Sequence, residues 1–231
     1  MRDDADGPLS RHIRTLAASW RAMAAPHPGS WVVEDEGVVA SRVPDHPVLD
    51  NAILLEPGAL PCLRELYPPT SAYAVWTHSP GCAAVVEAAG FARSEVTHPM
   101  VCRIEDAPPP TEADRSAVVG GRPVDVVDEL NGLDPDLLAG VEGLEVWTDR
   151  GGDSCAALFR CDDDVNVSMV ATRPEARRRG LASAVLRVAL ADARARGAVT
   201  ASLQSSEMAV GLYAGLGFRQ VATWQEWQLP R

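Results

Sequence analysis

The last third of the chain alternates strand and helix patterns, and this order constrains the fold more than any other feature. An apolar run over residues 165–172 predicts a strand, and apolar residues then recur at helical spacing from Leu181 to Ala193 until Gly197 ends the helix. A strand over residues 199–203, a helix over 206–216 and a strand over 218–229 complete the chain. Strands that alternate with helices form a sheet that those helices cover. We therefore expect an α/β fold with a mixed sheet.

The first half of the chain carries weaker patterns of the same kinds. They predict helices over residues 9–24, 60–66 and 81–89, a hairpin over 31–40, and strands over 51–55, 73–76 and 100–104. Residues 105–121 combine a proline run with charges and glycines, which is typical of a linker. A strand over 124–127, a short helix over 134–139 and a hairpin over 144–161 follow. We expect an N-terminal domain over residues 1–104, a linker over 105–121 and a C-terminal domain over 122–231.

One segment of the first half repeats in the second. Residues 76–91 align with residues 203–218, and both end a strand, pass a short turn, run through an alanine-rich helix and close on Gly-Phe. The match favours an internal duplication. The alternative is that any strand and helix ending in Gly-Phe would align in this way.

Composition limits the partners and the compartment. The chain has 32 acidic residues against 21 basic ones, all of them arginine, and its net charge of −11 would repel nucleic acids and anionic membranes. Its apolar runs are shorter than the roughly 20 residues of a membrane-spanning helix, and its first residues are acidic where a secretory signal is basic. The five cysteines lack metal-ligand spacing. We expect a cytoplasmic protein with reduced thiols and no metal, nucleic-acid or membrane partner.

Residues 172–183 have the features of an anion site. The first amides of the helix that opens at Leu181 have no partner within the helix and carry the positive end of its dipole. Gly180 lets the backbone approach an anion closely, Ala182 adds little bulk, and the arginines at 177–179 add positive charge. The alternative is a solvated basic turn that only begins a helix.

Residues 206–218 form the second candidate segment. Leu212 and Leu216 lie one helical turn apart and are expected to face a core, and Gly217 ends the helix. Tyr213 points away from Leu212, so its hydroxyl can reach a cleft. The alternative is a packed ring whose hydroxyl is satisfied inside the protein.

Together the two segments resemble the GCN5-related N-acetyltransferase (GNAT) family. The family's acyl-CoA motif, Arg/Gln-x-x-Gly-x-Gly/Ala, appears as Arg177-x-x-Gly180-x-Ala182. The family's Asn-x-x-Ala-x-x-Leu-Tyr helix appears as Ser206-x-x-Ala209-x-x-Leu212-Tyr213, followed by Gly217-Phe218. The resemblance covers residues 155–229, and Ser206 departs from the frequent asparagine, although its hydroxyl can still cap the helix.

The resemblance implies a GNAT fold: a mixed, mostly antiparallel sheet with helices on both faces, in which strands 165–172 and 199–204 splay into a V. With the repeat, it implies tandem GNAT-like halves. It implies acetyl-CoA as cofactor, and it assigns to Tyr213 the protonation of the departing CoA thiolate. The residues expected to bind the cofactor are Val170, Ala171, Thr172, Arg177, Arg178, Arg179, Gly180, Leu181, Ala182, Ser183, Ser206 and Ala209.

The acceptor side is less well defined. Residues 172–183 are called the cradle from here on. Many members of the family use a glutamate on the strand before the cradle as general base, and strand 165–172 has none. Glu145, Asp149 and Glu226 are the remaining candidates, and the alternative favoured for each is a solvated surface charge.

The residues of the first half suggest a supporting part. We expect His12, His27 and His46 in surface or loop positions. The first half has Val86 where the second has Tyr213, and residues 51–70 contain no Arg-x-x-Gly-x-Ala motif. It is therefore expected to be a degenerate GNAT-like copy that walls the acceptor pocket.

These inferences predict an acetyl-CoA-dependent N-acetyltransferase that acetylates a small-molecule amine by direct attack, as a monomer or a homodimer. One alternative is an inactive acyl-CoA-binding regulatory protein, which the missing strand glutamate favours and Tyr213 opposes. Another is an acetyltransferase of a protein or an aminoacyl-type substrate.

Overall fold

The computed structural model describes residues 7–35, 37–68 and 71–230. The first half of the chain packs helices against short strands. Its helices are α1 (Pro8–Ala24), α2 (Leu60–Leu66) and α3 (Pro80–Ala88), and its strands are β1 (Trp31–Asp35), β2 (Val38–Arg42), β3 (Asn51–Leu54), β4 (Ala74–Thr77) and the long β5 (Ala92–Arg103).

The second half contains the longer strands. Its strands are β6 (Val118–Gly120), β7 (Leu144–Asp149), β8 (Ser154–Cys161), β9 (Asp164–Thr172), β10 (Thr200–Ser206), β11 (Arg219–Gln220) and β12 (Trp224–Gln228). Its helices are α4 (Glu112–Ala117), α5 (Asp125–Asn131), α6 (Leu181–Ala195) and α7 (Val210–Ala214).

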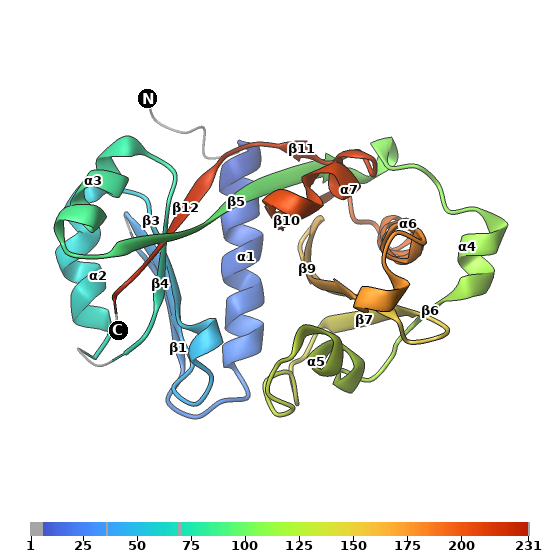
Figure 1. Ribbon diagram of the computed structural model, residues 1–231, viewed down its shortest axis with the longest axis horizontal. Helices are drawn as coiled ribbons and strands as arrows, with labels where there is room; N and C mark the ends of the chain where they lie inside the picture. Colours follow the sequence, from blue (N-terminus) through green and yellow to red (C-terminus); the bar gives the residue numbers. More distant parts are fainter. Residues whose placement is uncertain (1–6, 36, 69–70, 231) are drawn as a thin grey trace.

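Within the described residues the strands form one twelve-stranded sheet that runs the length of the molecule (Figure 1). The strand order is β1-β2-β3-β4-β12-β5-β10-β9-β8-β7-β6, with β11 beside β5. The pairs β3–β4 and β9–β10 are parallel, and the other pairs are antiparallel. The expected mixed, mostly antiparallel sheet with helices on its faces is therefore confirmed.

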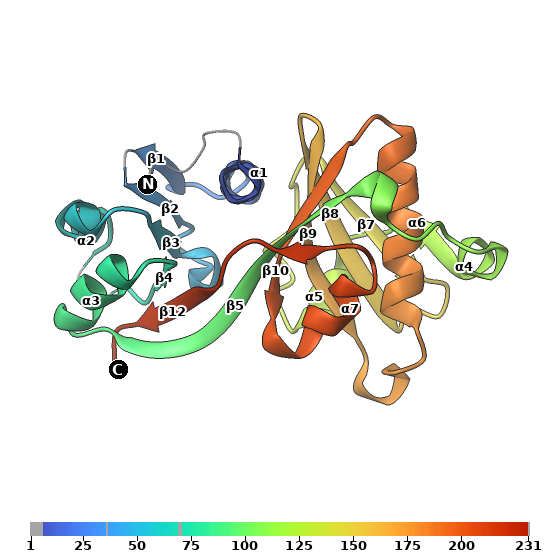
Figure 2. The ribbon, with the colours of Figure 1, turned by 90° about the horizontal axis from the view of Figure 1, so that it is seen from above.

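Two strands cross between the halves, as Figure 2 shows. The second part of β5 pairs with β10, from Thr97 to Arg103, and the last strand of the chain, β12, inserts between β4 and the first part of β5. Each half thus receives a strand from the other. Each half also holds one parallel pair joined through a helix, which is compatible with a duplication, and the duplication itself stays a prediction.

Helix α1 lies between the two halves (Figure 1). Its residues Leu16, Trp20 and Met23 join one hydrophobic cluster with residues of both halves, among them Val39 of β2 and Trp224 of β12. On the other face of the C-terminal strands, the apolar side of α6 forms a second cluster through Val185, Leu186 and Leu190. The strands of the second half are therefore covered by helices on both faces.

The position of α1 corrects the expectation for one histidine. His12 is completely buried and its ring centroid lies 5.4 Å from that of Trp224. Burial lowers the pKa of His12 to about 4. The expectation of a surface or loop position is wrong for His12, because the sequence does not show that α1 is covered on two sides. His46 lies in a loop after β2, as expected, with its side chain buried.

The segment between residues 105 and 121 is structured. Helix α4 begins with a capping box in which Thr111 Oγ1 accepts from the Asp114 amide at 3.1 Å. Asp114 binds Arg187 of α6 through two hydrogen bonds of 3.0 Å, and β6 pairs with β7. Residues 105–121 therefore contain regular elements, and the linker and the domain boundaries stay a prediction.

Three further local expectations differ from the structure. Residues 124–127 were expected to form a strand but lead into helix α5, and residues 134–139 form turns where a helix was expected. The helix expected over 206–216 is shorter, and the strand expected over 218–229 is divided into β11 and β12. None of the helices in the described residues has the length and apolar character needed to cross a membrane.

Candidate active site

The parallel strands β9 and β10 open into a V. They pair only where Thr200 to Ser202 face Asp164 to Asn166, and beyond these residues they have no common register. At the closed end, Asp164 accepts hydrogen bonds from Thr200 Oγ1 at 2.6 Å and from Ser202 Oγ at 2.9 Å. Hydroxyl groups on one strand and a buried carboxylate on the other therefore hold the strands together just before they diverge.

The open part of β9 contains a β-bulge. Its register with β8 shifts between Cys155 and Ala157, so that Met169 and Val170 lie opposite the single residue Ala156. Met169 has a φ of 52°, a left-handed conformation that is uncommon outside glycine. The bulge turns the backbone of the following residues, which is a frequent feature of strands beside active sites.

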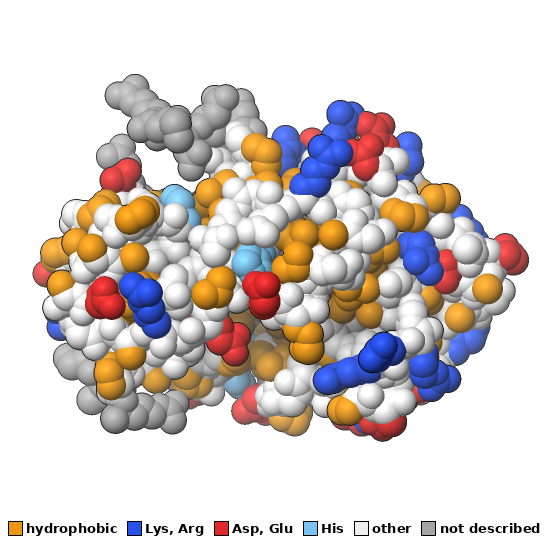
Figure 3. Space-filling model, turned by 45° about the horizontal axis from the view of Figure 1, so that its top comes forward, with side chains coloured by type: hydrophobic (Ala, Val, Ile, Leu, Met, Phe, Trp, Pro, Cys, Tyr) orange, Lys and Arg blue, Asp and Glu red, His pale blue; other side chains and the backbone are white. Residues whose placement is uncertain are grey.

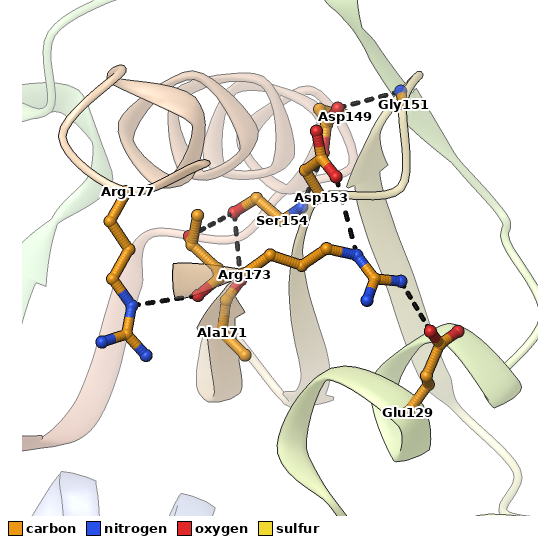
Figure 4. Close-up of polar contacts among 9 residues, drawn as sticks. Glu129, Asp149, Gly151, Asp153, Ser154, Ala171, Arg173 and Arg177 are labelled. Atoms are coloured by element: carbon orange, nitrogen blue, oxygen red, sulfur yellow. Dashed lines mark hydrogen bonds and ion pairs between the residues drawn. The ribbon is translucent and has the colours of Figure 1, made fainter. Parts of the chain in front are cut away.

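The end of β9 is held by Ser154, the first residue of β8, and by Arg177 (Figure 4). Ser154 Oγ donates to the Ala171 carbonyl at 3.1 Å and lies 2.8 Å from Thr172 Oγ1. Arg177 Nε donates to the Thr172 carbonyl at 3.1 Å, which draws the arginine turn back onto the strand end. The neighbouring Arg173 points away, to Glu129 at 2.6 Å.

A cavity of about 790 Å³ fills the V between the two strands. Its walls come from β9, the turn before α6, the first residues of α6, the end of β10 and α7. All but one of the residues expected to bind the cofactor line it: Val170, Ala171, Thr172, Arg177, Arg178, Gly180, Leu181, Ala182, Ser183, Ser206 and Ala209. Arg179 is exposed in the same turn and does not line the cavity.

Gly180 stands at the N-terminus of α6, where one end of the cavity lies. Its φ of 79° is left-handed, which explains the glycine, and a Cβ built on it would meet nothing within 4 Å. The space in front of the first helical turn is therefore open. Free amides, a helix dipole and the exposed guanidinium groups of Arg177 and Arg178 face this space, and together they suit a phosphate or pyrophosphate.

Tyr213 lies in the wall of the same cavity. Its ring is 7% exposed and packs edge-on against Phe218, with the ring centroids 5.9 Å apart. Burial raises the pKa of Tyr213 to about 12, so the phenol is protonated at neutral pH and can donate a proton or a hydrogen bond. The ring of Tyr213 is packed inside the protein, and the residue also lines the cavity, so each of the two alternatives for Tyr213 describes part of its position.

The three carboxylates considered as general bases lie elsewhere. Glu145 pairs with Arg196 on the far side of β7, and Asp149 accepts from the amides of Gly151 at 2.9 Å and Ser154 at 2.6 Å to shape a turn (Figure 4). Glu226 lines a separate cavity of about 550 Å³ in the N-terminal half. None of these three side chains lines the 790 Å³ cavity.

Sequence reasoning missed several residues near the site. Asn131 of α5 and Gln204 of β10 line the cavity. His98 of β5 pairs with Ser205 of the neighbouring strand β10, and its Nε2 lies 2.5 Å from Glu207 Oε2. Glu207 directly follows the motif residue Ser206. The polar residue at position 207, within the second motif, was the one signal that could have drawn attention to this pair.

The molecular surface is hollowed near the centre of the face in Figure 3. Hydrophobic side chains are visible inside the hollow, Lys or Arg side chains gather on its right and Asp or Glu side chains lie on its left. A ligand on this face would therefore meet opposite charges on the two sides.

Comparison with known proteins connects this geometry to a family. Residues 142–220 match the acetyltransferase (GNAT) domain family. No curated protein matches the chain significantly in sequence.

Among solved structures, the chain is similar to a GCN5-related N-acetyltransferase from Kribbella flavida, with a TM-score of 0.67 and 19% identity over 94% of this chain and 95% of that one. It is similar to a putative GNAT-family acetyltransferase from Novosphingobium aromaticivorans, with a TM-score of 0.65 and 20% identity over 96% and 98% of the two chains. A tandem GNAT protein from the clavulanic acid biosynthesis pathway has a TM-score of 0.52 and 12% identity over 95% and 94%. The chain thus has the GNAT fold, and residues 142–220 match the GNAT acetyltransferase domain.

Proposed function

We propose that this protein is an acetyl-CoA-dependent N-acetyltransferase of a small-molecule amine. The observation that supports this most is the single cavity that joins the N-terminus of α6, the open edge of β9 and the hydroxyl-bearing ring of Tyr213. An anion site, an extended backbone edge and a proton donor lie along one space in the order that a CoA thioester would need.

The residues at each part of the cavity fit the cofactor. Arg177, Arg178 and the amides of residues 181–183 would hold the pyrophosphate, because the space before Gly180 is open and positively charged. The backbone of residues 170–172 has no strand partner on the β10 side and would pair with the pantetheine arm. Bound acetyl-CoA supplies an activated acetyl group as a thioester.

The protein's own residues would then manage the protons. The amine nitrogen forms a bond to the acetyl carbon, the carbon–sulfur bond breaks, and the Tyr213 hydroxyl donates to the departing sulfur. The amine must lose a proton in the same reaction. Glu145, Asp149 and Glu226 lie outside the cavity, so we propose that this proton leaves to water in the open V.

The acceptor is proposed from the surroundings of the cavity. Helix α1 packs against β9 and β10, the two strands of the V, and on this basis we propose a small molecule rather than a folded protein as acceptor. The net charge of −11 favours a cationic amine. The second candidate function, an acyl-CoA-binding regulator without turnover, is favoured by the position of the three carboxylates and opposed by the protonated phenol in the cavity.

The experiment combines binding and turnover. Calorimetry with CoA should show binding, and a panel of small amines with acetyl-CoA should show release of the CoA thiol for at least one amine. Binding of CoA without thiol release from any amine would favour the regulator. Absence of CoA binding would contradict both functions.

A further inference from the structure

We propose that Asn131 is a positioning residue that holds the bulge of β9 in the form that receives the pantetheine arm. This inference rests on the proposed function, because the role of the bulge depends on CoA binding in the V. Asn131 is the last residue of α5, and it reaches across to β9 from a helix that the motifs do not include.

The bulge needs outside support. Met169 has no glycine-like freedom, and a left-handed conformation costs a non-glycine residue energy that surrounding contacts must offset. The carbonyl oxygen of Met169 accepts a hydrogen bond from Asn131 Nδ2 at 3.1 Å. The same oxygen lies 3.4 Å from Cys155 Sγ. The amide of Asn131 therefore provides the main polar partner of the strained residue.

The second donor bond of Asn131 fixes the amide itself. Nδ2 also donates to the Val127 carbonyl, one helical turn earlier, at 2.9 Å. An asparagine amide has two hydrogens, and these two carbonyls engage both. Although Asn131 lines the cavity, its nitrogen is thus committed to the protein, and we infer that this nitrogen acts through β9.

The consequence concerns the residues that follow the bulge. Side chains of a strand alternate between faces, so losing the one extra residue would turn every following residue to the opposite face. Val170, Ala171 and Thr172 would then present the wrong backbone groups to the V. The first turn of α6, which would bind the pyrophosphate, lies beyond the 3₁₀ turn Pro174–Ala176. It is joined to the end of β9 through the hydrogen bond from Arg177 to the Thr172 carbonyl, so we expect it to depend on this register less than residues 170–172 do.

The experiment compares CoA with a probe that lacks the pantetheine arm and one phosphate of the pyrophosphate. Adenosine 3′,5′-diphosphate tests the phosphate end of the site, and CoA tests the phosphate end together with β9. The isosteric variant Asn131→Asp removes both donors and places a carboxylate beside two carbonyls. We expect its dissociation constant for CoA to rise about tenfold or more, the factor expected when a hydrogen-bonded carbonyl loses its partner, with a much smaller rise for adenosine 3′,5′-diphosphate.

Two further variants make the test specific. Asn131→Leu removes the donors without adding charge and should give the same pattern. Met169→Gly should restore CoA affinity in the Asn131→Asp background, because glycine adopts a positive φ without support. Val127→Ala, which creates a cavity at a buried position of the same helix, is the control and should leave the ratio of the two affinities unchanged.

Wild-type affinity for CoA in both Asn131 variants would overturn the inference, and so would an equal loss of affinity for both probes. Failure of Met169→Gly to restore any CoA affinity would also overturn it. If the wild-type protein bound neither probe, the proposed function itself would fail, which is a different result from any of these.

Discussion

Replacing Tyr213 with phenylalanine removes one hydroxyl group from the wall of the cavity and leaves the ring in place. The ring is 7% exposed, and its edge-on contact with Phe218 does not involve the hydroxyl. We therefore expect the variant to keep its fold and its affinity for CoA, so that a change in rate reports on the hydroxyl alone.

The expected loss follows from two pKa values. Burial raises the pKa of Tyr213 to about 12, whereas a free thiol has a pKa of about 8.5. Complete transfer of the proton from the phenol to the thiolate is then uphill by about 5 kcal/mol. A hydrogen bond to the developing thiolate is the larger contribution on this basis, so kcat should fall about ten- to hundredfold, at or below the lower end for general acids.

The assay is thiol release at saturating acetyl-CoA and amine, with calorimetry for CoA. Tyr73→Phe is a matched control, because that ring is also 7% exposed but lines the cavity of the N-terminal half. Its kcat should equal that of the wild type. An unchanged kcat in Tyr213→Phe would remove the hydroxyl from the mechanism, and a loss of about ten-thousandfold would show that full proton transfer contributes.

The other predictions concern the cradle, the number of sites and the acid range. Gly180→Glu should weaken CoA binding about a hundredfold in calorimetry, because it puts a carboxylate at the open N-terminus of α6; Gly180→Ala has the same backbone strain without the charge, and equal affinities for the two variants would mean that residues 177–183 only begin a helix. CoA should saturate at one molecule per chain, because β3 and β4 pair along their full length and leave no V in the N-terminal half; two sites of similar affinity would contradict this. Arg187 lowers the pKa of Asp114 from 3.8 to about 2, so the stability from this pair is present above pH 3.8 and is lost as the pH falls toward 2. Urea unfolding should therefore show Asp114→Asn destabilised near neutral pH and matching the wild type near pH 2, and a difference independent of pH would refute the assignment.

Much of the candidate site could be predicted because its geometry is local. The conformation at the start of α6 depends on residues close by in the sequence. This holds for the left-handed Gly180, for the free amides after it and for the arginines before it. Tyr213 belongs to the same class, because its place in the helix follows from the spacing of the leucines around it. These residues were predicted as a group, and all but Arg179 line one cavity.

Helix α5 shows where local patterns fail. Its valines favour a strand by propensity, yet Val127 and the N-cap residue Val124 lie three residues apart and pack into the same hydrophobic cluster as α1. Asp125 and Asp128 in the first turn favour a helix as well. The deciding term was burial of the helical face against elements far away in sequence, which no short window contains.

The sequence by itself determined the family motifs, the elements that contain them and the sign of the charge around the cradle. Only the tertiary structure decided the exchange of β5 and β12, the pairing of His98 with Glu207 across 109 residues, and the contact of Asn131 with Met169. The physical reason is that backbone hydrogen bonds between strands are the same for every sequence. A strand pattern therefore shows which face is buried but not which strand lies beside it, and the partners of distant side chains depend on that choice.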